Sequence, residues 1–351
     1  MSMNKNFRMF NGKISFLIDL KTLIIFGIFL FLTVFLFVIS TGTGELKMSP
    51  LAVLKVFFGG GSEMNRLVVQ SFRLPRIIVA LIVGMALAVA GAILQGMIRN
   101  PLASPDVLGI TTGASVAVVG FLALFSDKNN ALTVSINWLP LAAFIGAVGV
   151  TILIYFLSWK KGASPFRLVL IGIGISYLMQ ALTTLLIILG PITQASQANM
   201  WITGTVYGSK WSSVYIIVPW TLLFILLSLF LSRNVNIQGL GDEMATGVGV
   251  SVQRQRLLLL LISTGLVGGA VAFGGGIGFV GLMAPHIARK LVGSSFGSLC
   301  AIAALIGGIL VMLADLIGRT FFSPLEIPAG VFTAGIGAPY FIYLLYKTRN
   351  S

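Results

Sequence analysis

The chain has 351 residues, of which 57% are hydrophobic and only 9% are charged, with a formal net charge of +14. Soluble domains carry about 25% charged residues and about 45–50% apolar ones, so this composition excludes an ordinary soluble domain and indicates a polytopic membrane protein. The basic residues stand singly at the ends of apolar runs, which is typical of topology signals and argues against nucleic-acid binding. One cysteine and one histidine exclude an internal disulfide and a Cys/His zinc site.

The first apolar run follows a basic flank and covers residues 20–40. About 20 apolar residues cross the hydrocarbon core, whereas the hydrophobic region of a signal peptide has about 7–15. We therefore expect a retained first helix. Nine further runs follow, near 77–98, 109–126, 136–158, 167–190, 213–232, 256–273, 277–293, 298–318 and 327–346. The sequence thus predicts an all-α protein of ten transmembrane helices, least certain across 256–293, where "GGAVAFGGGIGFVG" is typical of either a turn or a loosely wound helix.

Ten spans place both termini on one side of the membrane. With the termini inside, 15 of the 23 lysines and arginines fall in inner segments and eight in outer ones. This excess agrees with the positive-inside rule. We expect one domain, residues 1–351, that crosses the cell membrane many times and keeps both termini in the cytoplasm.

One polar segment interrupts the apolar pattern between the sixth and seventh spans. Residues 236–256 read "NIQGLGDEMATGVGVSVQRQR", and the predicted topology places them in the cytoplasm. We expect one or two short helices along the membrane face here, which would dock a partner. A solvated amphipathic loop is the alternative.

The sequence carries no recognisable means of hydrolysing ATP and no catalytic constellation. It contains no G-x-x-x-x-G-K-[ST] phosphate loop, and its one histidine, His286, is expected to have a structural role. Among the nine acids only Asp315 lies clearly inside a span, and Arg319 follows on the same helical face. A self-neutralising i,i+4 pair is favoured there over a proton relay. We therefore expect no enzyme activity, no catalytic residue, no cofactor and no bound metal, and energy supplied by another subunit.

Four motifs together carry a resemblance to a known family. They are R-L-P-R at 73–76, "NPLASPDVLG" at 100–109, "GFVGLMAPHIAR" at 278–289 and "IPAGVFTAGIGAP" at 327–339. The chain from about residue 51 to 347 closely resembles the binding-protein-dependent ABC permeases that import iron–siderophore complexes, haem and cobalamin. In "NPLASPDVLG", Ser104, Pro105 and Asp106 also read as a helix start, so we assign them no substrate contact.

The resemblance implies partners and site residues. It implies two ABC ATPase subunits, a second permease chain that is identical or homologous, an extracytoplasmic substrate-binding protein and a ferric siderophore as cargo. It also implies that spans 2–5 and 7–10 are related by an inverted repeat. The residues it assigns to ATPase coupling in 236–256 are Gly241, Asp242, Glu243, Arg254 and Arg256.

Five of the eight outer cations lie between the first two spans, and the resemblance explains this cluster. In related importers, outer arginines pair with glutamates of the binding protein, which a planar guanidinium suits. The matching residues here are Arg73, Arg76 and Arg319. Membrane-interface anchoring remains the alternative for Arg73 and Arg76, and the pair with Asp315 remains the alternative for Arg319.

Forty-one glycines, many of them inside spans, predict close helix packing. Gly172 and Gly174 are additionally interpreted as thinning the wall of a transport pathway. We expect a hydroxamate-type ferric siderophore as cargo, with cobalamin or haem as alternatives. An ion-coupled secondary carrier is the alternative from another class.

Overall fold

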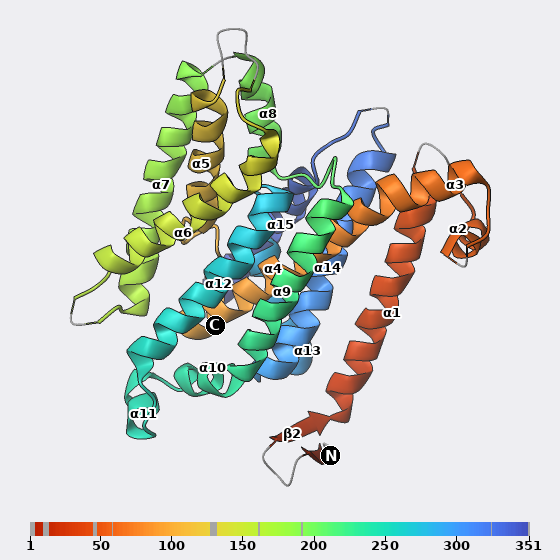
Figure 1. Ribbon diagram of the computed structural model, residues 1–351. Coiled ribbons are helices and arrows are strands. Elements are labelled where there is room, and N and C mark those ends of the chain that lie inside the picture. The colour runs from red at the N-terminus through yellow and green to blue at the C-terminus, as the bar shows by residue number, and fades with distance from the viewer. Residues whose placement is uncertain are drawn as a thin grey trace.

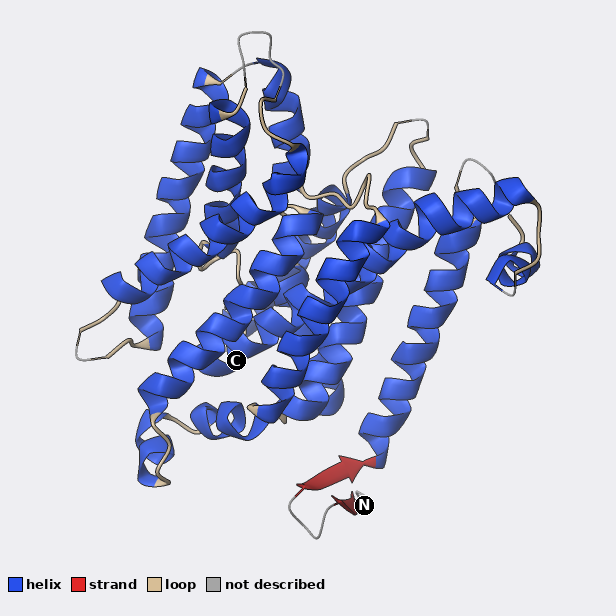
Figure 2. Cartoon of the chain, in the orientation of Figure 1, coloured by secondary structure: helices blue, strands red, loops and turns tan. Residues whose placement is uncertain are grey.

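The computed structural model describes residues 4–9, 14–44, 48–57, 59–126, 132–160, 162–190, 192–323 and 325–349. A two-stranded antiparallel hairpin, β1 (Asn4–Met9) and β2 (Ile14–Asp19), precedes the first helix. Every other secondary-structure element assigned within these ranges is a helix (Figure 2). The all-helical expectation did not include this hairpin. The membrane part is all-α, as predicted.

Each predicted span has a helical counterpart. These are α1 (Leu20–Gly42), α4 (Leu74–Ile98), α5 (Ile110–Leu124), α6 (Leu139–Leu157), α7 (Pro165–Leu189), α9 (Trp211–Phe230), α12 (Val252–Gly274), α13 (Val280–Val292), α14 (Phe296–Thr320) and α15 (Ala329–Arg349). Eight of them, in the described part of the chain, are long and apolar enough to cross a membrane. The all-α prediction of about ten transmembrane helices is therefore confirmed, with two of the ten helices, α5 and α13, too short to cross a membrane by themselves.

The two short helices are α5, with 15 residues, and α13, with 13. At 1.5 Å per residue they are about 22 Å and about 20 Å long, less than the roughly 30 Å hydrocarbon core. They occupy corresponding places in the two halves of the chain, as the third and eighth spans. This pairing supports the expected inverted repeat, because such repeats commonly carry interrupted helices at matching positions.

Further helices lie at the two ends of the bundle. The segment between α1 and α4 forms α2 (Pro50–Phe57), α3 (Glu63–Leu67) and the π-helical turn η1 (Val68–Arg73), which runs directly into α4. The 3-10 turn η2 (Ile136–Trp138) precedes α6, and α8 (Ile192–Thr203), which was not predicted, follows α7. The helices α10 (Ser232–Gly239) and α11 (Asp242–Gly247) lie at the same end as the N-terminal hairpin, while α2 and α3 lie at the other (Figure 1).

The core is built around α4, which packs against α12, α13 and α14. Two glycine pairs allow these backbones to meet. A Cβ on Gly84 would overlap the carbonyl oxygen of Gly307, and a Cβ on Gly91 would overlap that of Gly281. Close helix contact, predicted from the glycine-rich spans, is thus confirmed on α4.

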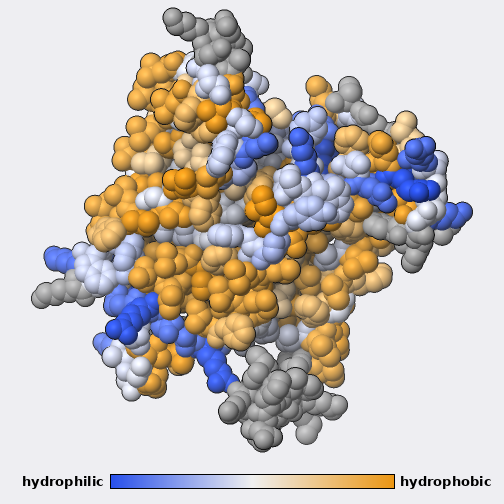
Figure 3. Space-filling model, viewed as in Figure 1, coloured by the Kyte–Doolittle hydropathy of each residue, from blue (hydrophilic) through white to orange (hydrophobic). Residues whose placement is uncertain are grey.

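The outer surface of the bundle is apolar. Figure 3 shows a broad hydrophobic region flanked by hydrophilic residues over the two ends. In the most apolar 18-residue stretches of α1 and α7, only 6% and 11% of the residues are buried inside the protein. The corresponding share is 83% for the helix that contains α4. The exposed faces of α1 and α7 therefore contact lipid or another chain, as expected for a multi-pass membrane protein.

Candidate functional site

The polar segment forms two short helices at one end of the bundle (Figure 1). α10 ends at Gly239, and Gly241 then adopts a φ of 117°, a conformation that glycine tolerates readily. Asp242 and Glu243 fill the first turn of α11, where the positive end of a helix favours acidic side chains. The expectation of short helices here is confirmed.

Asp242 holds this segment to the membrane helices. Its carboxylate oxygens accept hydrogen bonds from Nη2 of Arg256 at 3.0 and 2.9 Å, and Oδ1 also meets Nη2 of Arg99 at 3.2 Å. Arg256 is 1% exposed and also donates to the carbonyl of Ala163. A buried guanidinium needs such a counter-charge, so Asp242 and Arg256 position α11 against α4 and α12.

Other side chains of the segment face outward. Glu243 and Arg254 are exposed, and neither forms an ion pair with a described residue. Leu240, Met244 and Val248 are 70%, 64% and 68% exposed. Met244 lies within α11, and Leu240 and Val248 lie just before and just after it.

We call Leu240, Glu243, Met244 and Val248 the α11 surface. The sequence interpretation considered only the charges of the segment and missed its apolar side chains. The available signal was the presence of these large apolar residues in an otherwise polar segment. A surface of this kind suits a protein partner, because exposed apolar side chains gather at interaction sites.

The predicted docking arginines meet at the opposite end. Nε of Arg76 lies 3.0 Å from Oδ1 of Asp315, and its Nη1 lies 2.9 Å from Oε2 of Glu326. Arg76 also lies over the ring of Tyr207, 5.5 Å from its centroid. Nε of Arg319 is 3.6 Å from Oδ2 of Asp315. The i,i+4 pair is thus present, but Arg76, not Arg319, is the closer partner of Asp315.

The other two arginines bind the end of α1. Nη1 of Arg73 donates to the carbonyl of Thr41 at 2.8 Å, and Nη1 of Arg319 donates to the carbonyl of Thr43 at 2.7 Å. Arg319 also donates to the carbonyl of Ser40. The last carbonyls of a helix lack intrahelical donors, so the two arginines satisfy them. The cluster therefore joins α1, α4 and α14, and a docking role for its arginines stays a prediction.

A carboxylate that the sequence analysis did not place in the membrane lies between these two ends. Oδ1 of Asp106 accepts from the Thr111 hydroxyl at 3.1 Å, and Oδ2 accepts from the backbone N–H of Phe279 at 3.2 Å. Phe279 has a φ of 66°, which is unusual for a bulky residue. Asp106 thus joins the first turn of α5 to the start of α13.

Ser104 caps as expected, since its Oγ accepts the backbone N–H of Val107 at 3.4 Å, but residues 105–109 form turns and the regular helix α5 begins only at Ile110. The Asp106 carboxylate therefore lies outside α5 and accepts hydrogen bonds from Thr111 in its first turn and from Phe279 just before α13. A short, interrupted apolar run is the signal that would have flagged Asp106, since ionisable groups at membrane depth are costly and commonly functional.

The two glycines expected to line a pathway lie in different surroundings. A Cβ on Gly172 would lie 3.0 Å from Cα of Leu108, so this glycine packs against the turn that carries Asp106. Nothing lies within 4 Å of a Cβ built on Gly174, which is exposed. The side chain of Ser176 also contacts this turn, donating to the carbonyl of Val107 at 3.3 Å. Pathway lining stays a prediction for both glycines.

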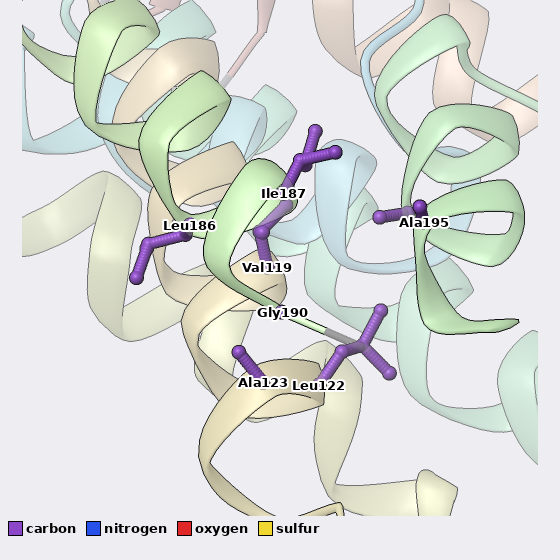
Figure 4. Close-up of a pocket in the computed structure, with 8 residues that line it drawn as sticks. Val119, Leu122, Ala123, Leu186, Ile187, Gly190 and Ala195 are labelled. Carbon is purple, nitrogen blue, oxygen red and sulfur yellow. The ribbon is translucent and has the colours of Figure 1, made fainter. Parts of the chain in front are cut away.

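A small gap between α5, α7 and α8 is lined only by glycine, alanine, valine, leucine and isoleucine (Figure 4). Its free volume of about 10 Å³ is that of a single water molecule. The gap cannot hold a metal chelate and is best explained as a packing defect.

The fold and these sites define a multi-pass membrane transport protein, with polar surfaces at both ends of a helical bundle and a carboxylate inside it. Comparison with known proteins then gives the family. The chain belongs to the FecCD transport family, whose model matches residues 32–347.

Relatives match nearly the whole chain. It is 58% identical to the "Probable siderophore transport system permease protein YfhA" of Bacillus subtilis, over 94% of this chain and 96% of that protein. It is 47% identical to the achromobactin transport system permease protein CbrC of Dickeya dadantii, over 97% and 96%. It is 43% identical to the iron(3+)-hydroxamate import system permease protein FhuG of Bacillus subtilis, over 94% and 98%.

A solved structure shares the architecture. The structure described as "An inward-facing conformation of a putative metal-chelate type ABC transporter" matches with a TM-score of 0.81 and 33% identity, over 92% of this chain and 99% of that one.

Proposed function

We propose that the chain is the permease subunit of an ABC importer that moves a ferric siderophore, of the hydroxamate type, across the cell membrane. The observation that carries this proposal is the similarity to siderophore and iron-hydroxamate permeases along at least 94% of the chain. No relative named above is a cobalamin or haem permease, which favours the siderophore over those cargoes. The iron would arrive inside its chelator, so the chain itself needs no metal ligands and carries out no chemical reaction.

Separate ATPase subunits would power the transport. The sequence has no phosphate loop, so two ATPases are proposed to bind from the cytoplasm. The α11 surface offers them three exposed apolar side chains and the Glu243 carboxylate. Arg256 and Asp242 would transmit the movement of the ATPases, because their ion pair ties α11 to the start of α12. This arrangement implies cytoplasmic termini.

A substrate-binding protein would dock at the opposite end. Among the three arginines, Arg76 is the best candidate, because its partner Glu326 keeps 36% of its side chain exposed. A carboxylate of the binding protein would replace Glu326 in the pair. Arg73 and Arg319, bound to the end of α1, would support the docking surface rather than form it.

A second permease chain, identical or homologous, would complete the pathway. The exposed face of α7 is the proposed contact, since only 11% of the residues in its most apolar stretch are buried within this chain. Gly174 lies on that face and Gly172 on the face that packs against the Asp106 turn. The pathway would then run beside α7, close to the two short helices.

The first experiment is growth under iron starvation of a strain that lacks this gene, fed one defined chelate at a time. We expect loss of growth on ferric hydroxamates and restoration by the wild-type gene. Loss restricted to ferric citrate would keep the importer and change the chelate class, and loss restricted to haem or cobalamin would reject the siderophore. Normal growth on every chelate would reject the proposed function.

A further inference from the structure

A cavity of about 620 Å³ lies between α4, α10, α13 and α14, at the α11 end of the bundle. Gln95, which is 2% exposed, and Leu299 form part of its buried wall. Arg99 and Lys290 lie on its exposed rim. The cavity adjoins the α11 surface, with which it shares Leu240, but it extends inward between the membrane helices.

The lining of this cavity is strongly basic. It includes Arg99, Arg289, Lys290 and His286 and contains no aspartate or glutamate. Arg99 is paired with Asp242. Arg289 makes no ion pair with any residue that the structure describes. The cavity therefore holds uncompensated positive charge, which an anion would neutralise.

Two lining residues carry buried polar atoms that lack partners among the described residues. They are Oε1 of Gln95 and both ring nitrogens of His286. The amide nitrogen of Gln95 donates to the carbonyl of Leu282 at 3.2 Å. Buried polar groups are nearly always hydrogen-bonded. An accepting oxygen beside cations indicates a ligand that carries a hydroxyl as well as negative charge.

The N-terminus of α14 adds to the same site. Ser294 and Phe296 line the cavity, and no side chain of the preceding residue, Ser295, caps the helix. Asn236 accepts the N–H of Phe296 at 2.8 Å. This helix has 25 residues, and the positive end of a helix favours anions.

We propose that this cavity binds a phosphate group with a hydroxylated substituent. Arg289, Lys290 and Arg99 supply the cationic donors, and His286 and Gln95 meet the substituent. A phosphate fits better than a carboxylate because its oxygens point in more directions, toward donors that come from three separate elements. The same chemistry is offered by the headgroup of phosphatidylglycerol and by a soluble phosphate ester. Basic pockets between membrane helices commonly hold anionic headgroups.

The test uses the purified full-length chain and native mass spectrometry. It compares phosphatidylglycerol, phosphatidylcholine with the same acyl chains, and sn-glycerol 3-phosphate as a competitor. The variants are Arg289→Gln and Lys290→Gln. Arg233→Gln is the matched control, because Arg233 is an exposed cation on α10 outside the cavity. Each cavity variant should weaken phosphatidylglycerol binding about fivefold, and the control should bind like the wild type.

Each remaining outcome is decisive. Binding of sn-glycerol 3-phosphate without phosphatidylglycerol, weakened by the same two substitutions, would keep the phosphate site and assign it to a soluble ligand. Equal binding of both lipids, or equal binding by all variants, would overturn the proposal. A Ser294→Cys variant tests a protein occupant, since protection of this thiol by the ATPase subunit, with none by either phosphate ligand, would also overturn it. Unchanged melting of both glutamine variants would exclude misfolding as the cause of any loss.

Discussion

At the residue scale, the polar segment separates into side chains that hold it in place and side chains that it presents to a partner. Asp242 belongs to the first kind, because it contacts both Arg99 and Arg256. Glu243, the next residue, is exposed and outside any ion pair with described residues. A sequence interpretation that groups the two acids by charge cannot separate these roles, since the cations come from the ends of α4 and the start of α12.

Asp242→Asn should loosen α11 without unfolding the bundle. We expect a loss on the order of 1–2 kcal/mol in the local opening free energy, since Arg256 loses its counter-charge while solvent screens the half-exposed carboxylate. Hydrogen exchange across residues 240–250 would measure it as faster exchange. Glu243→Gln is the control and should exchange like the wild type. Equal exchange in both variants would show that the ion pair does not anchor the segment.

Asp106→Ala should destabilise the junction of the two short helices. The Phe279 N–H and the Thr111 hydroxyl would lose their acceptor, which costs about 1–3 kcal/mol for a buried donor. We expect a lower Tm for the solubilised protein and reduced uptake. Thr111→Val removes only one of the two donors and should have the smaller effect. If the two variants melted at the same temperature, the hydrogen bond from Phe279 to Asp106 would contribute nothing to stability.

At the element scale, the sequence predicted well what depends on local composition. The helices of the apolar runs were predicted because runs of about 20 residues have no other stable form in a membrane. The bounds of α5 and α13 fall within one to three residues of the predicted runs 109–126 and 277–293. Long-range pairs lay beyond reach, since Arg76 and Asp315 are 239 residues apart. Only the i,i+4 partner, Arg319, could be predicted.

Gly91→Ala should disrupt the packing of α4 against α13. The added methyl would overlap the carbonyl oxygen of Gly281, and a backbone atom cannot rotate away. Overpacking of this kind costs about 1–3 kcal/mol or more. Gly174→Ala is the matched control, because nothing lies near its added methyl. Thermal unfolding should show a clear fall in Tm for Gly91→Ala alone, and similar values for both would contradict the close approach.

At the scale of the whole molecule, the two proposed partner sites lie at opposite ends of the same helices. α4 runs from the Arg76 cluster to the Arg99–Asp242 pair, and its 25 residues span about 37 Å. α14 also connects the two ends, from the cavity beside Phe296 to Arg319. Asp106 lies between them, where the two short helices meet. The proposed function therefore places one partner on each side of the membrane, with α4 and α14 joining the two sites.

This separation predicts that the two partners can be removed independently. Changing Leu240, Met244 and Val248 to serine should abolish ATPase binding, because these exposed side chains form the apolar part of the α11 surface. The fold should be unaffected, since they are largely exposed in the isolated chain. Arg76→Gln should instead weaken the binding protein and leave ATPase binding intact.

Pull-down of each purified partner by each variant in lipid nanodiscs measures both effects. The triple serine variant should retain the binding protein and lose transport. Arg76→Gln should lose the binding protein, retain the ATPase and lose transport, and its Tm should fall because Asp315 and Glu326 lose their common cation. If one variant lost both partners while its Tm stayed at the wild-type value, the ends would be coupled before any partner binds. The proposal of two independent surfaces would then fail.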